Sequence, residues 1–441
     1  MLRGALRLDL LVYAGSAAFA LATAFGSEFY GYRVWGNFAS AGYVLAFLLT
    51  ALFASRGGVR WLAVAVAGAL STLAPLLVLV HVRDPKFVWG QWPWSFPAQP
   101  EVWVVERSAR TLFADGTPYL DLATLDRAPH PDDYTPYGPA MTVFGMPRAL
   151  FGDHPLTDSR VMFLLGSALA VCAAWRVLGR PTIPVRAAQI AAITPLTALT
   201  FAVAGDDLAV IALIVLACAL AYRAHPGWTG TMCAVVVTMK MTAVPAAVVL
   251  GVGLLACRGG RAFAVFLGAA LSVGAAIVVP VLIADPGSFV EHVIKFPVGL
   301  GQATSPASSP LPGHLIAGTG PVGHLIALVL LAVAACAISV WLVLRPPRSA
   351  SDAVLRIASG LGAAIVLAPA TRWGYLVYPV ALLGSMLWFA SVTTKDSAAN
   401  SATEPGVGGA RTPVPTLRTP EWARPGATSS WFEWHRLVHA R

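Results

Sequence analysis

The chain has 441 residues, of which 57% are hydrophobic and only 12% are charged, whereas an ordinary soluble domain has about 25% charged residues. This composition excludes a soluble enzyme. The net charge of +9 does not indicate a nucleic-acid binder either, because the basic residues stand mostly in connectors between apolar blocks. Backbone in lipid must satisfy its hydrogen bonds within each segment, so we expect an all-α polytopic membrane protein.

The apolar blocks match the roughly 20 residues that a helix needs to cross a bilayer and predict about eleven or twelve transmembrane helices. In chain order the blocks are 9–27, 38–55, 61–81, 161–179, 187–204, 208–223, 229–257, 262–283, 321–344, 356–371 and 374–392. The block 229–257 is too long for one upright helix and contains Lys240 and Pro245 at its middle. We expect a broken hairpin there, with Lys240 near the inner face.

The distribution of charge predicts the orientation of the chain. With the N-terminus in the cytoplasm, nineteen basic and six acidic residues lie inside, and ten basic and fifteen acidic residues lie outside. Short inner connectors rich in arginine follow the positive-inside rule. We therefore predict that both termini are cytoplasmic.

This topology divides the chain into four regions. Residues 1–81 form N-terminal transmembrane helices, of which the first resembles a secretory signal but is expected to stay uncleaved. Residues 82–160 form a large outer loop. Residues 161–392 form a transmembrane core with a second outer loop at 285–320. Residues 393–441, rich in Ser, Pro, Gly and Ala, are expected to be a disordered cytoplasmic tail.

The large outer loop is the first place to look for a binding site. Its aromatic residues are Trp89, Trp92, Trp94, Trp103, Tyr119, Tyr134 and Tyr137. Aromatic faces beside carboxylates suit sugar rings, although Trp89–Trp94 also fits a cluster at the membrane interface. The pattern from Glu101 to Leu120 predicts an amphipathic helix that ends at Asp115-Gly116-Thr117-Pro118.

Carboxylates in this loop are candidates for acid–base chemistry. Glu101 and Glu106 stand near the start of the predicted helix, where a carboxylate can act as a base toward a hydroxyl or merely complement the helix dipole. Asp132 and Asp133 are adjacent in a proline-rich turn. Such acids are more often solvated than metal-bound, and we expect no metal site.

Several motifs resemble those of glycosyltransferase family 87, within the GT-C superfamily of transferases that use polyprenyl-phosphate sugars. The motifs are Glu101-Val102-Trp103, Gly116-Thr117-Pro118-Tyr119, Tyr134-Thr135-Pro136-Tyr137-Gly138-Pro139, Gly205-Asp206-Asp207-Leu208, Met239-Lys240-Met241-Thr242-Ala243, Lys295-Phe296-Pro297, Ser305 to His314 and Ala370 to Tyr375. The likeness spans roughly residues 60 to 390 and points to a bacterial branch. Two departures stand out: the catalytic acid of the family is usually an aspartate, and about three spans precede this loop.

The resemblance implies transfer of a hexose, such as mannose, from a polyprenyl-phosphate donor to an extracytoplasmic glycolipid or glycan, with inversion. The protein would be a multi-pass enzyme of the bacterial cytoplasmic membrane. It implies that Glu101 is the catalytic base, with Glu106 as the second candidate for this role. It implies Arg372, Lys295 and His314 as groups that bind the donor phosphate.

Other readings of these residues stay open. Arg372 would otherwise form a structural ion pair, and Lys295 would pair with Glu291 one turn earlier. Tyr134, Tyr137, Trp103, Asp206 and Asp207 are the candidates for binding the sugar or acceptor, and the two aspartates also fit the start of a helix. No cofactor is expected, and a divalent metal is not excluded. The competing function is a transporter or flippase with a binding site at broken helices.

Overall fold

The computed structural model describes residues 2–53, 58–83, 97–297 and 299–402. Within these ranges the chain is helical, and its only pairing of extended segments is an isolated bridge between Ser308 and Thr371. The predicted all-α fold is confirmed for these residues. The Trp89–Trp94 cluster and residues 403–441 of the predicted tail lie outside them.

The helices follow one another with short connections in most of the chain. In the N-terminal half they are α1 (Leu2–Gly26), α2 (Tyr30–Phe53), α3 (Val59–Gly68), the π-helical turn η1 (Ala69–Leu73), α4 (Ala74–His81), α5 (Pro100–Asp115), α6 (Met146–Phe151), α7 (Ser159–Val177), α8 (Val185–Ala192) and α9 (Pro195–Val203). In the C-terminal half they are α10 (Asp206–Tyr222), α11 (Pro226–Met239), η6 (Met241–Ala243), α12 (Val244–Ala284), α13 (Pro286–Phe289), η7 (Val290–Lys295), α14 (Pro312–Ala317), α15 (Pro321–Leu344), α16 (Ala350–Leu367), η8 (Trp373–Leu376) and α17 (Val377–Ala402). The last helix continues beyond the predicted end of the final span at 392.

Eight helices in the described residues are long and apolar enough to cross a membrane, and the bent pair α8 and α9 makes a ninth if it is one span. Every predicted apolar block is helical over most of its length, either within one helix or across consecutive helices, yet this count is below eleven. One reason is that α10 has 17 residues and α11 has 14, so α10 is about 26 Å long, short of a core of about 30 Å. The other is that Met241–Ala284 counts once, although a break divides it.

The structure contains the broken hairpin that the sequence predicts over 229–257. α11 ends before Lys240, whose backbone is extended, and α12 begins at Val244. α12 then breaks at Gly259, where φ is 79°, a conformation that favours glycine. Its second part packs closely on α11, because a Cβ added to Gly230 would lie 2.1 Å from the carbonyl oxygen of Phe266. Lys240 therefore stands at the tip between α11 and α12.

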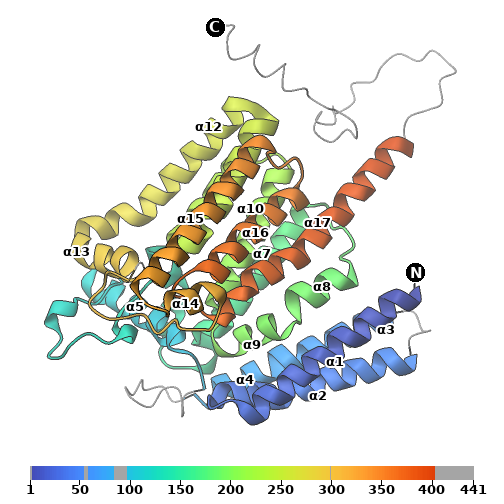
Figure 1. The fold of residues 1–441 in the computed structure, drawn as a ribbon, viewed down its shortest axis with the longest axis horizontal. Helices are drawn as coiled ribbons and strands as arrows, with labels where there is room; N and C mark the ends of the chain where they lie inside the picture. Colours follow the sequence, from blue (N-terminus) through green and yellow to red (C-terminus); the bar gives the residue numbers. More distant parts are fainter. Residues whose placement is uncertain (1, 54–57, 84–96, 298, 403–441) are drawn as a thin grey trace, which may run out of the picture.

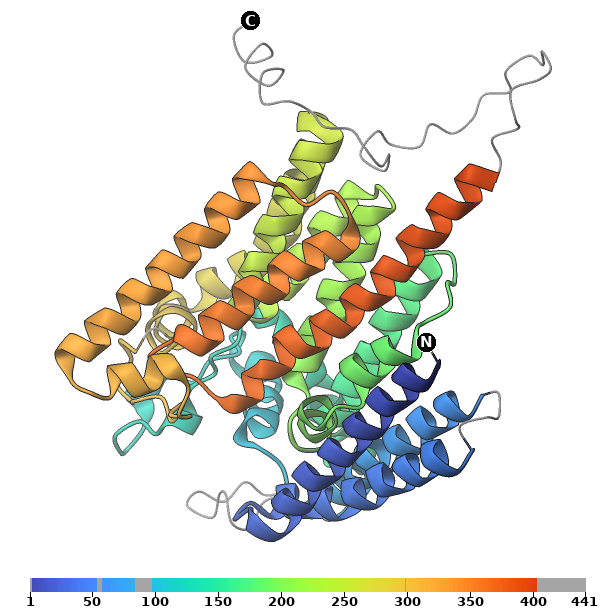
Figure 2. The same cartoon turned by 45° about the vertical axis from the view of Figure 1, so that its right-hand side comes forward.

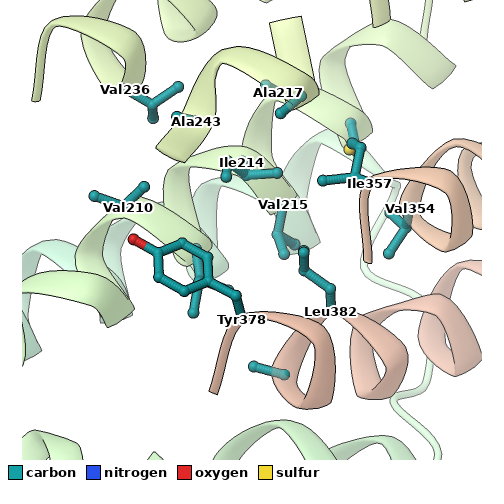
Figure 3. Packing of buried hydrophobic residues seen from close by; sticks show 14 of the residues in the cluster. Val210, Ile214, Val215, Ala217, Val236, Ala243, Val354, Ile357, Tyr378 and Leu382 are labelled. Atoms are coloured by element: carbon teal, nitrogen blue, oxygen red, sulfur yellow. The ribbon is translucent and has the colours of Figure 1, made fainter. Parts of the chain in front are cut away.

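The main hydrophobic core surrounds α10. Thirteen of its 17 residues are buried, and Figure 3 shows Val210, Ile214 and Val215 of α10 among side chains of α11, α16 and α17. A helix covered on all sides needs apolar residues all round. This explains why the block 208–223 has no polar face and why α10 is held firmly at its start, where two aspartates stand.

The N-terminal helices lie along one side of the bundle (Figure 2), and their buried residues form a second hydrophobic cluster with those of α9. Pro75 has no N–H to donate to the carbonyl of Ser71, and this carbonyl accepts a hydrogen bond of 2.8 Å from Trp35 Nε1. The helix adapts there through the π-helical turn η1. Tyr43 donates a hydrogen bond of 2.6 Å to the carbonyl of Ile193, between α8 and α9. These contacts fix α2 against η1 and next to the junction of α8 and α9.

The polar connections gather at one end of the bundle, which we call the loop end. α5, α13 and α14 lie there, whereas α1 begins and α17 ends at the opposite end (Figure 1). α5 is the predicted amphipathic helix, and it stops at Gly116, where φ is 73°. Val102 and Val105 on this helix are buried, whereas Phe113 is 52% exposed.

Candidate functional site

A cavity of about 790 Å³ opens at the loop end, and we call it the cleft. Its polar lining includes Glu101, Asp132, Asp206, Asp207, Lys240 and Arg372. Its apolar lining comes mainly from α1 and α9, through Phe19, Leu196, Leu199 and Val203. The cleft therefore joins a charged chamber to an apolar wall between two membrane helices.

Glu101 and Arg372 form an ion pair in the charged chamber. Glu101 stands in the first turn of α5 behind Pro100, and Arg372 directly precedes η8. Arg372 Nη1 donates to Glu101 Oε1, whereas Oε2 of Glu101 is buried without a hydrogen-bond partner among the described residues. The Glu101 carboxylate raises the pKa of Arg372, so this arginine is charged at any physiological pH. One carboxylate oxygen is thus held by a cation, and the other has unused capacity to accept a hydrogen bond.

The link that contains Arg372 is fixed by backbone contacts with the second loop. Ser309 N–H donates to the carbonyl of Thr371 at 2.9 Å, and Thr371 N–H donates to the carbonyl of Ala307 at 3.1 Å. The isolated bridge between Ser308 and Thr371 records the same pairing. This local ladder places Arg372 opposite α5 although the two ionic partners are 271 residues apart.

A second charged group surrounds Lys240. Asp206 and Asp207 begin α10 after Gly205, whose φ of 99° requires glycine. Lys240 Nζ lies 2.9 Å from Asp206 Oδ2 and also contacts Asp207 Oδ1. Tyr378 donates a hydrogen bond of 2.8 Å to Asp207. The two aspartates are predicted site residues, and both line the cleft.

The expectation that Lys240 lies near the inner face is wrong, because it shares the cleft with Glu101 of the large loop. Its ammonium lies 5.2 Å from the ring centre of Tyr137 and 5.5 Å from that of Tyr375. Two carboxylates and two aromatic faces therefore compensate for its burial. A charge in an apolar block is a functional hypothesis by default, and this signal could have identified Lys240 as a residue of the site.

Glu106 lies elsewhere, in a buried cluster of ion pairs. Arg83 Nη2 is 2.6 Å and Arg148 Nε 3.3 Å from Glu106 Oε2, and Ser159 N–H donates to Oε1 at 3.1 Å. Arg83 also reaches Asp158 at 2.7 Å, which ties α5 to the start of α7. Glu106 is 2% exposed and does not line the cleft. The structure thus separates the two predicted bases.

The predicted aromatic residues divide in the same way. Tyr137 lines the cleft. Tyr134 is fully buried outside it, stacked on Phe296 with ring centres 4.0 Å apart, and its hydroxyl accepts from Gln302 N–H at 2.9 Å. Trp103 is 6% exposed, with the Arg83 guanidinium 4.9 Å above its ring. Of these three, the structure brings only Tyr137 to the charged chamber.

The other two predicted phosphate-binding groups do not line the cleft. Lys295 is 50% exposed and lies 3.1 Å from Glu291, one turn earlier, which is the alternative that the sequence left open. The Nδ1 atom of His314 is 2.8 Å from the carbonyl oxygen of Pro369. His314 therefore joins α14 to the link before Arg372. Arg372 alone of the three is placed to meet a ligand in the cleft.

Sequence reasoning missed several residues that shape the cleft. Tyr375 and Trp373 follow Arg372, and Tyr32 of α2 accepts a hydrogen bond from Gln99 next to Glu101. The motif around Arg372 contains the two aromatic residues, so their proximity could have been inferred. The contact between α2 and α5 could not, because it depends on how the N-terminal helices pack. Within the described part of the chain, no three His, Cys, Asp or Glu side chains are grouped as metal ligands.

A glycine next to Tyr137 fixes the approach of the loop to the Lys240 tip. Gly138 N–H donates to the carbonyl of Met239 at 2.9 Å, and a Cβ at Gly138 would lie 2.1 Å from the carbonyl oxygen of Thr238. Gly138→Ala is expected to destabilise the protein by about 1–3 kcal/mol and to displace Tyr137. Thermal unfolding in detergent measures this. Gly15→Ala, where the added Cβ meets nothing within 4 Å, is the control, and equal stability of both variants would contradict the prediction.

Comparison with known proteins adds one match. A sequence model of glycosyltransferase family 87 matches residues 134–371, more than half of the 441 residues. No curated protein matches the chain, and no solved structure does. The matched segment includes Tyr137, Asp206, Asp207 and Lys240 of the cleft. Glu101 precedes it and Arg372 follows it directly.

Proposed function

The chain belongs to glycosyltransferase family 87, and we propose that this membrane glycosyltransferase transfers a hexose, such as mannose, from a polyprenyl-phosphate donor to a glycolipid or glycan acceptor. The observation that carries the donor class is the cleft itself. Its lining combines a cation and a carboxylate with an apolar wall from α1 and α9. A sugar joined through phosphate to an isoprenoid chain needs the same combination of charged and apolar surroundings.

Arg372 is the group that we assign to the donor phosphate. A guanidinium can donate two parallel hydrogen bonds to phosphate oxygens, and Arg372 is charged and lines the cleft. In the structure its partner is Glu101. A phosphate that binds Arg372 competes for this guanidinium and loosens its hold on the Glu101 carboxylate. Donor binding would therefore prepare the base.

Glu101 is the base in the proposed reaction. The acceptor hydroxyl donates its proton to Glu101 while the acceptor oxygen bonds to the anomeric carbon on the face opposite the phosphate. The bond between that carbon and the phosphate oxygen breaks, and its electron pair leaves with the polyprenyl phosphate. Attack from the opposite face inverts the anomeric configuration. The unpartnered Oε2 of Glu101 is the atom that would take the proton.

The charge distribution supports an extracytoplasmic cleft in the bacterial cytoplasmic membrane. The connectors at the end opposite the loops carry the arginine-rich segments, and such segments favour the cytoplasm. The cleft opens at the loop end, which is then the outer face. The acceptor would be a glycolipid or glycan that reaches this face.

A donor panel tests the proposed function. Purified protein in nanodiscs is given synthetic polyprenyl-phosphate hexoses, nucleotide hexoses as the contrasting donors, and octyl glycosides as acceptors. We expect transfer from a lipid-phosphate donor and none from a nucleotide sugar. Transfer from nucleotide sugars alone, or no transfer from any donor combined with flux of a lipid-linked sugar across liposomes, would refute the proposal and favour the transporter.

Replacing Arg372 tests the phosphate site within this assay. Arg372→Lys keeps the charge but loses the paired donors, so we expect KM for the donor to rise about 10- to 100-fold. KM for the acceptor should change little. Arg110→Ala is the control, since Arg110 forms an exposed ion pair with Asp153 outside the cleft. An unchanged donor KM in Arg372→Lys would rule out the assigned role.

A further inference from the structure

Two adjacent aspartates in the large loop have different surroundings. The carboxylate of Asp133 is held by Arg127 at 2.6 and 2.8 Å and by the backbone N–H of His130 at 2.7 Å. Burial would raise the pKa of Asp133, but these contacts lower it. Asp133 therefore stabilises the turn. Asp132 instead lines the cleft.

Arg107 fixes the position of Asp132 relative to Glu101. Its guanidinium donates to the backbone carbonyls of Asp132 and Asp133, each at 2.8 Å, and to that of Tyr134 at 3.3 Å. Arg107 and Glu101 both belong to α5. One helix thus carries Glu101 in its first turn and, further along, clamps the backbone from which Asp132 extends.

The carboxylate of Asp132 has no arginine or lysine partner among the described residues, in contrast to the other acids of the cleft. Its nearest ionisable contact is His130 Nδ1 at 3.7 Å. The Asp132 N–H donates a hydrogen bond of 3.3 Å to this nitrogen. When the imidazole of His130 is neutral, its proton is therefore on the other ring nitrogen. Asp132 is largely buried, with 16% of its side chain exposed. Burial raises the pKa of Asp132; His130 opposes this rise and the charge of Glu101 adds to it.

We propose that Asp132 binds hydroxyl groups of the acceptor sugar and so holds the attacking hydroxyl next to Glu101. This inference rests on the proposed function and adds a second carboxylate to the site. An ionised carboxylate only accepts hydrogen bonds, and neighbouring hydroxyls of a sugar supply donors to both oxygens. The phosphate of the donor is anionic and would be repelled by Asp132. The acceptor is therefore the substrate that this residue recognises.

The test separates acceptor binding from donor binding. In nanodiscs with full-length protein, Asp132→Asn should raise KM for octyl glycoside acceptors about 10- to 100-fold, while KM for the polyprenyl-phosphate donor changes less than about twofold. Asp126→Asn, at an exposed position of the same loop, removes the same charge and should leave both constants unchanged. A rise in donor KM instead, or an unchanged acceptor KM, would overturn the proposal.

Equilibrium binding of radiolabelled octyl mannoside and octyl glucoside to the same nanodiscs keeps the two proposals distinguishable. If the wild-type protein transfers sugar from no donor but binds either glycoside, and Asp132→Asn weakens that binding tenfold or more, the proposed reaction fails and the sugar site stands. If the wild-type and Asp132→Asn proteins bind both glycosides equally, the role of Asp132 is refuted whether or not transfer occurs.

Discussion

Glu101→Gln is expected to lower kcat for sugar transfer about 10²- to 10⁴-fold, the range for loss of a general base. Glutamine keeps the size and polarity of the side chain but cannot take the proton from the hydroxyl group of the acceptor sugar. Binding of the donor should change little, because Arg372 stays in place and loses its competing carboxylate. The measurement is kcat with saturating donor and acceptor, together with donor affinity.

Glu106→Gln is the matched control, since the same change is made five residues along α5. Glu106 accepts from Arg83 and from Ser159 N–H within the buried cluster. We expect this variant to lose stability because Arg83 and Arg148 lose a charged partner, while the folded protein keeps its kcat. Full activity in Glu101→Gln with lost kcat in folded Glu106→Gln would reverse the assignment of the base.

Lys240→Met should destabilise the protein by about 3–5 kcal/mol, the range for breaking a buried ion pair. Only 12% of the Lys240 side chain is exposed, and its removal leaves Asp206 and Asp207 next to each other without a cation. Denaturant unfolding in detergent micelles measures the loss. The double variant Lys240→Met, Asp207→Asn removes one of the two negative charges and should recover part of the stability.

Lys295→Met provides the comparison for Lys240. Lys295 forms a half-exposed pair with Glu291, and such pairs contribute about 0–1 kcal/mol. A Lys240→Met protein as stable as Lys295→Met would show that the charged group around Lys240 does not hold the fold. The role of this charged group would then lie in substrate binding.

The sequence predicted most of the helices because apolar periodicity and length depend on local residues. The helix predicted to start at Glu101 begins one residue earlier and ends before Gly116 as predicted, and the block 321–344 coincides with α15. The number of spans was harder to predict. α10 has 17 residues and is apolar because protein surrounds it, so its composition resembles that of a helix facing lipid.

The choice between Glu101 and Glu106 could not be made from the sequence. Residues five apart on a helix point about 140° away from each other, so α5 can present only one of them to the cleft. Which glutamate faces the cleft depends on the positions of Arg83 and Arg372, and these positions result from packing between distant helices. The same limit applies to Tyr134 and Tyr137, which are close in sequence and end in different environments.

Lys240 shows the opposite case, in which a signal was present but was interpreted incorrectly. An isolated lysine in an apolar block needs a compensating charge, and Asp206 and Asp207 begin a neighbouring helix. Pairing these residues would have placed Lys240 at the loop end. The hairpin was predicted correctly, but its tip was assigned to the wrong end of the bundle.

The most direct test of the central claim is a structure of the protein in nanodiscs with a non-hydrolysable polyprenyl-phosphonate hexose. We predict that the phosphonate lies within hydrogen-bond distance of Arg372, with the sugar next to Glu101 and the isoprenoid chain along the apolar wall between α1 and α9. A phosphonate bound instead in the separate pocket that Arg258 and Arg348 line would contradict the account.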